Sequence, residues 1–83
     1  MIYFANELLD IKEKVKSVAF KRSLYCVKGT KEPIYVLKLL GHDGFFVESA
    51  YGMGIDVLES EIDEALDFLR NNGFEIDSHS VIS

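Results

Sequence analysis

The spacing of apolar residues at the start of the chain predicts an amphipathic helix over residues 3–20. Apolar side chains recur three or four residues apart there, which places them on one side of a helix. These residues are Phe4, Leu8, Ile11, Val15 and Val18. Basic residues crowd the second half of the segment, where cations complement the helix dipole.

Three strands are predicted next, over 23–28, 34–40 and 45–50. β-branched and aromatic residues fill these segments, and such residues favour strands. A loop with glycine and proline separates the first two. The second is apolar on both faces except for Lys38, which is typical of a central strand. Gly41-His42-Asp43-Gly44 is a tight-turn signal and predicts a hairpin into the third strand.

A second helix is predicted from Asp56 onward. Asp56 and Glu59 have the spacing of a capping box, and Asn72-Gly73 supplies a stop signal because glycine adopts the left-handed conformation. The apolar stripe between them comprises Leu58, Ile62, Ala65, Leu66 and Leu69.

The loose alternation of residues 74–82 predicts a last strand, which either extends an edge of the sheet or pairs with a second copy of the chain. The expected order is α-β-β-β-α-β. The economical arrangement is an α+β fold, an antiparallel sheet with both helices packed on one face. The 83 residues allow one domain, spanning 1–83.

Composition narrows the class of protein. The apolar fraction of 48% is above that of disordered chains. Cys26 is the single cysteine, which excludes an intrachain disulfide and fits a reducing, cytoplasmic setting. We expect neither a signal peptide nor a membrane span, because charges begin at Glu7 and no apolar run is long enough.

Charge is divided unevenly along the chain. Residues 1–41 carry eight of the nine basic side chains and a net charge of +4, whereas residues 42–83 carry a net charge of −9. Six acids fall within twelve residues: Asp56, Glu59, Glu61, Asp63, Glu64 and Asp67. Such a concentration creates a negative potential that steers a basic partner. These six residues are the candidate partner-binding site.

Two interpretations of the acidic segment remain open. It is a solvated helix face, or it is an interaction surface that imitates the charge of nucleic acid and occupies a basic groove. The second predicts a small non-catalytic inhibitor or sequestering factor whose partner is a basic nuclease or nucleic-acid-binding protein. A further alternative is a regulatory homodimer, because a basic half and an acidic half are self-complementary.

No catalytic, cofactor or metal site is predicted. His42 and His79 are far apart in sequence, and neither has a visible second group to position it. Cys26 lies in an apolar segment without a neighbouring base. Gly52-Met53-Gly54 does not complete a phosphate-binding motif. The acids of the second helix lack the loop arrangement of a calcium site. We therefore expect a protein that is not an enzyme.

The helix and strand order resembles the outline of double-stranded-RNA-binding domains. That family places lysines at the start of its second helix, where this chain has Asp56, Glu59 and Glu61. Direct nucleic-acid binding is therefore not expected. In size and charge alone, the chain is similar to phage-encoded inhibitors of host defence, to immunity proteins and to antitoxins.

Overall fold

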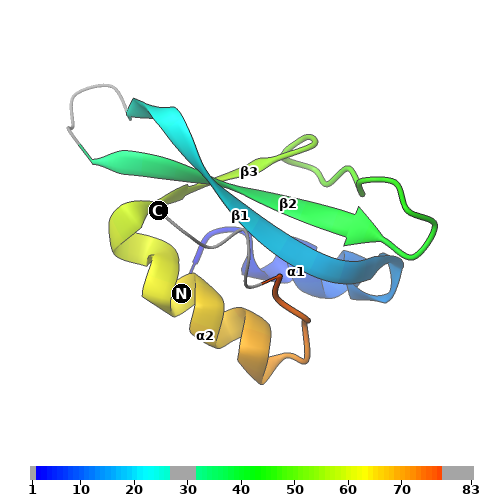
Figure 1. Ribbon diagram of the computed structural model, residues 1–83. Helices are drawn as coiled ribbons and strands as arrows, with labels where there is room; N and C mark the ends of the chain where they lie inside the picture. Colours follow the sequence, from blue (N-terminus) through cyan, green and yellow to red (C-terminus); the bar gives the residue numbers. More distant parts are fainter. Residues whose placement is uncertain (1, 27–31, 78–83) are drawn as a thin grey trace.

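The computed structural model describes residues 2–26 and 32–77, with the backbone alone over 23–26. The sheet has three antiparallel strands in the order β1-β2-β3 (Figure 1). The elements follow one another as α1 (Ala5–Ile11), the 3-10 helix η1 (Lys12–Lys14), β1 (Val15–Cys26), β2 (Pro33–Gly41), β3 (Ile55–Leu58), the 3-10 helix η2 (Glu59–Glu61) and α2 (Ile62–Asn71). The predicted α+β class is confirmed, and the order of the elements is close to the predicted one.

Both helices lie on the same side of the sheet (Figure 1). The core fills the space between the helices and the sheet, and it contains apolar side chains alone among the described residues. Its fully buried members come from every main element: Phe4, Leu8, Val18, Phe20, Leu37, Leu39, Ile55, Val57, Ala65 and Leu69. Within residues 2–26 and 32–77, no helix covers the opposite side of the sheet. We call it the open face.

The prediction of a helix through residue 20 is wrong after residue 14. The chain turns into β1 at Val15, and the register against β2 shifts between Val15 and Ser17. This irregularity leaves Lys16 as the extra residue of a β-bulge. Because a bulge adds one residue to the alternation, Val15 and Val18 both face the core. Their spacing of three therefore imitates a helical pattern.

The third strand lies later than predicted. Residues 45–47 begin to pair with β2: the Gly41 N–H donates to the Phe45 carbonyl over 2.7 Å, and the Val47 N–H donates to the Leu39 carbonyl over 2.8 Å. The predicted hairpin turn is therefore present. The chain then leaves the sheet and returns as β3, which pairs with residues 34–37. The prediction of a strand over 45–50 is wrong beyond this short contact.

The segment after α2 pairs with the outer edge of β1 at Val18. Gly73 has the left-handed backbone expected of a helix stop, with φ of 78°. The Val18 N–H then donates to the Glu75 carbonyl, and the Asp77 N–H donates to the Val18 carbonyl, each over 2.8 Å. This contact is parallel to β1. The predicted last strand therefore extends the edge of the sheet as far as residue 77, and residues 78–82 lie outside the described residues.

Candidate functional site

The six acids of the candidate site are distributed over three kinds of local structure. Asp56 lies in β3, Glu59 and Glu61 lie in η2, and Asp63, Glu64 and Asp67 lie in α2. The prediction that the second helix begins at Asp56 is wrong, because residues 55–58 alternate between buried and exposed as a strand does. Asp56 therefore points to the open face, whereas α2 packs on the other side of the sheet.

Two carboxylates at the start of the helical segment have structural roles. Glu61 accepts a hydrogen bond from the Leu58 N–H over 3.0 Å, and Glu32, which precedes β2, accepts one from the Ser60 N–H. Both bonds occupy N–H groups that a helix start leaves without partners. The hydrogen bonds from Ser60 lower the pKa of Glu32 below its ordinary value. Asp56 and Glu59 do not form the predicted capping box.

Three of the acids are spaced four residues apart along the segment formed by η2 and α2. Asp63 and Asp67 lie on the same side of α2 because of this spacing, and Glu59 lies in η2, just before that helix. All three are exposed. No hydrogen bond or ion pair joins their carboxylates to another residue in the described part of the chain. We call these three residues the acidic ridge.

The opposite side of α2 fixes the ridge in place. Ala65 and Leu69 are fully buried, and Ile62 and Leu66 pack against the same core. The predicted apolar stripe is therefore confirmed along α2. Because the core holds one side of the helix, the ridge projects from a rigid support. An interaction surface of this kind loses little conformational entropy on binding.

A second exposed feature was not predicted. The loop between β2 and β3 carries four large apolar side chains that are about half exposed or more: Phe45, Phe46, Tyr51 and Met53. Phe45 is the most exposed, at 73%. The sequence pattern assigned Phe45 and Phe46 to an ordinary strand. The tight turn at 41–44 was visible in the sequence, but it does not reveal which aromatic rings face solvent.

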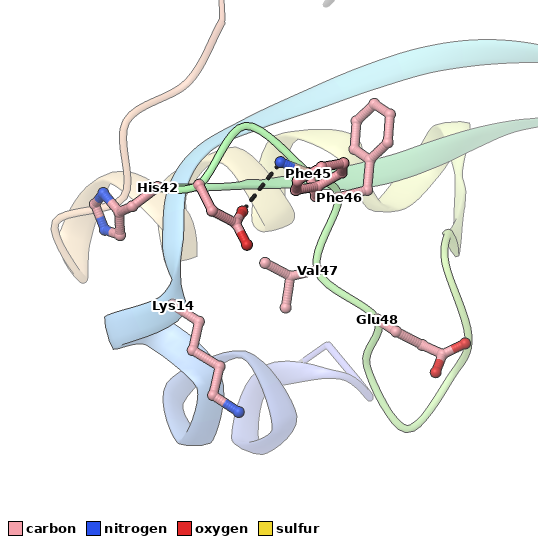
Figure 2. Close-up of a pocket in the computed structure, with 7 residues that line it drawn as sticks. Lys14, His42, Phe45, Phe46, Val47 and Glu48 are labelled. Atoms are coloured by element: carbon pink, nitrogen blue, oxygen red, sulfur yellow. Dashed lines mark hydrogen bonds between the residues drawn. The ribbon is translucent and has the colours of Figure 1, made fainter.

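A shallow hollow of about 440 Å³ lies beside this loop, lined by Lys14 of η1 and by residues of the loop between 42 and 48, which Figure 2 draws as sticks. Its floor includes Val47, and the imidazole of His42 lies on the far side of the turn from the two phenylalanines. Asp43 Oδ1 accepts a hydrogen bond from the Phe45 N–H over 3.0 Å. The carboxylate of Asp43 therefore stabilises the turn, as aspartate commonly does.

The other candidate chemical groups do not come together in the described residues. His79 and the side chains of Tyr25 and Cys26 lie outside the described part of the chain. Tyr35 is partly buried and packs against the core. Across residues 2–26 and 32–77, no three His, Cys, Asp or Glu side chains are grouped to hold a metal ion.

Comparisons with protein-family models, with curated proteins and with solved structures give no match. Within the described part of the chain, no helix has the length and apolar character needed to cross a membrane.

Proposed function

We propose that the protein is a small non-catalytic binder that meets a basic protein partner through the acidic ridge. The observation that carries this proposal is the regular spacing of Glu59, Asp63 and Asp67, three exposed carboxylates without partners in the described residues, along α2 and the 3-10 turn that precedes it. Asp56 and Glu61 no longer belong to the proposed contact, since one points to the open face and the other caps the helix.

The ridge suits a partner that ordinarily holds nucleic acid. Residues four apart on a helix lie about 6 Å apart along its axis. The ridge is therefore a linear series of negative charges, comparable in sign and repetition to a phosphate backbone. A basic groove lined with arginine or lysine is complementary to such a series. Charge attraction also accelerates the encounter between the two proteins.

This binding mode leads to inhibition or sequestration. A protein that occupies the basic groove of a nuclease or a nucleic-acid-binding complex excludes the nucleic acid from it. Phage-encoded inhibitors of host defence act on partners of this class, and immunity proteins and antitoxins are the alternative class. The charge and size of this chain suit both classes, so the partner decides between them.

The test compares two variants of the full chain with equal changes in charge. The ridge variant carries Glu59→Lys, Asp63→Lys and Asp67→Lys. The control variant carries Asp10→Lys, Glu13→Lys and Glu48→Lys, three exposed positions outside the ridge. Each protein is used as bait in native host lysate at low and moderate salt, and retained proteins are identified by mass spectrometry. Circular dichroism verifies that both variants are folded.

We expect the wild type and the control variant to retain the same basic protein, and the ridge variant to lose it. The purified partner should then release bound nucleic acid when wild-type protein is added. Retention of that partner by the ridge variant at full strength would show that the ridge is only a solvated helix face. Recovery of the chain alone would favour the self-associating homodimer.

A further inference from the structure

The open face of the sheet contains a hollow whose charge is opposite to that of the acidic ridge. The hollow has a volume of about 300 Å³. Strands β1 and β2 supply most of its lining, and the loop after β2 and the segment after α2 supply the rest. The lining residues are Ser17, Ala19, Lys21, Lys38, Leu40, Phe46 and Asp77. We call this feature the basic hollow.

The positive charges of the basic hollow come from Lys21 and Lys38. Lys38 lies opposite Ala19 in the register of β1 and β2, and Lys21 lies two residues further along β1. The two lysines are therefore diagonal neighbours on one face, roughly 7–8 Å apart. Neither ammonium group forms an ion pair with another of the described residues. Both are placed to bind an anion that enters the hollow.

Most of the remaining lining of the basic hollow is apolar, and Ser17 and Asp77 are its other polar residues. Ala19 and Leu40 are half-buried, and Phe46 is 51% exposed. Lys38 Nζ lies 5.4 Å from the centre of the Phe46 ring, a distance at which the ring quadrupole attracts a cation. This contact positions the ammonium group beside an exposed aromatic surface. The hollow therefore combines two positive charges and one carboxylate, that of Asp77, with an aromatic ring and aliphatic side chains.

Charge excludes three other occupants of the basic hollow. Two copies packed face to face would bring the lysines of one hollow towards those of the other. If the basic partner of the acidic ridge entered the hollow, Lys21 and Lys38 would repel its positive charges. A long polyphosphate chain would meet Asp56 on one side of the lysines and Asp77 on the other, on a protein with a net charge of −5. The charges therefore favour a short anion with apolar neighbours.

We infer that the basic hollow binds a short acidic peptide segment in which a carboxylate side chain and an apolar side chain lie two positions apart. Lys21 and Lys38 bind the carboxylates, and Phe46 and Leu40 contact the apolar groups. In an extended peptide, residues two positions apart point the same way. A carboxylate and an apolar side chain at such positions can therefore face the hollow together. This inference is independent of the proposed function, because it concerns another face and the opposite charge.

The test uses a fluorescein-labelled peptide with the repeat Glu-Ser-Phe-Ser, which places glutamate and phenylalanine two positions apart, and the Gln-Ser-Phe-Ser peptide is the uncharged probe. Binding to the full chain is measured by fluorescence anisotropy and mapped by amide chemical shifts. We expect the glutamate peptide to bind, to shift the amides of Lys21, Lys38 and Phe46, and to bind about tenfold more tightly than the glutamine peptide, because hydrogen bonds to charged groups are the stronger ones.

Two variants localise the contact. Lys38→Glu should weaken peptide binding by about tenfold or more, since one charge-assisted contact is replaced by repulsion. Arg22→Glu makes the same change in charge at an exposed position of β1, beside Tyr35 rather than in the hollow, and should retain most of the affinity. Phe46→Ala leaves the charge unchanged and should also weaken binding.

Four outcomes would overturn the inference. The first is the absence of peptide binding to the wild type, and the second is chemical-shift changes confined to other surfaces. The third is tighter binding of oligothymidylate than of the glutamate peptide at the same amides. The fourth is chemical-shift changes that grow with protein concentration when no peptide is present. The third would assign the hollow to nucleic acid, and the fourth to a second copy of the chain. The ridge variant should bind the peptide normally, which keeps this test separate from that of the proposed function.

Discussion

The phenol hydroxyl of Tyr3 donates a hydrogen bond to the backbone carbonyl of Asp56 over 2.8 Å. Asp56 lies in β3, the outer strand on that side of the sheet. The bond therefore occupies a carbonyl that strand pairing leaves free, and it joins the start of the chain to the sheet. The ring of Tyr51 packs edge-on against Tyr3, with the ring centres 5.1 Å apart. Through this ring contact, the loop between β2 and β3 also packs against Tyr3.

Removal of the Tyr3 hydroxyl should weaken the fold. We expect Tyr3→Phe to lower the free energy of unfolding by about 0.5–1.5 kcal/mol, the usual contribution of one hydrogen bond. The ring contact with Tyr51 is retained in this variant. Urea unfolding followed by circular dichroism measures the change. An unchanged midpoint would show that water replaces the hydroxyl without loss.

A comparison of the wild type with Tyr3→Phe in alkaline solution tests the same hydrogen bond. Burial raises the pKa of Tyr3 above its ordinary value of 10.0, and the negative charge of Asp56 adds to the effect. Because the folded pKa is higher than the unfolded one, the protonated hydroxyl contributes stability below pH 10 that is lost as the pH rises through the folded pKa. Wild type should therefore lose its advantage over Tyr3→Phe in alkaline solution. A constant difference across that range would contradict this assignment.

Gly54 is packed too closely for any side chain. A Cβ atom at this position would lie 2.6 Å from Cγ1 of Val36, and the branched valine has little freedom to rotate away. We expect Gly54→Ala to cost about 1–3 kcal/mol, as overpacking does. The double variant with Val36→Ala should be nearly as stable as Val36→Ala alone. Additive losses in this double-mutant cycle would show that the clash has another origin.

Buried and exposed apolar residues should differ sharply in their effect on stability. Leu69 is fully buried, so Leu69→Ala should lower the free energy of unfolding by about 2–5 kcal/mol. Phe45 is larger but is mostly exposed, and Phe45→Ala should change it by no more than about 0.5 kcal/mol. Urea midpoints of the two variants provide the comparison. A large loss on truncating Phe45 would mean that the loop aromatics support the fold.

The parts of the fold that the sequence predicted depend on uninterrupted periodicity. The apolar stripe of α2 and the glycine stop at Gly73 are regular features, and both are confirmed. The prediction at β1 was wrong because of the bulge at Lys16. The extra residue places the core positions Val15 and Val18 three residues apart, which is the spacing of a helix. The spacing of Asp56 and Glu59 predicts a helix start, but the structure has strand β3 over 55–58. Glu61 and Leu58 have the same spacing and form the actual cap, so spacing alone does not identify the first residue of the helix.

The candidate site was predictable only in outline. The density of acids was evident, but sequence alone did not separate Glu61, which caps the helix, from Glu59 and Asp63, which remain exposed. That distinction depends on where the helical segment begins. The basic hollow was not predicted at all. Lys38 and Phe46 come together because the chain turns back after β2, and the backbone hydrogen bonds of that turn decide which side of the sheet each side chain faces.

The contact between β1 and residues 75–77 also sets an order of events during synthesis. The N-terminal parts of a domain leave the ribosome first, so the β1–β2 hairpin emerges before the segment that pairs with Val18 has been made. During that interval the outer edge of β1 is open, and open edges pair with other chains. Nascent chains that stall before Phe74 should therefore be more prone to aggregate than completed chains, because residues 75–77 cover the part of this edge around Val18.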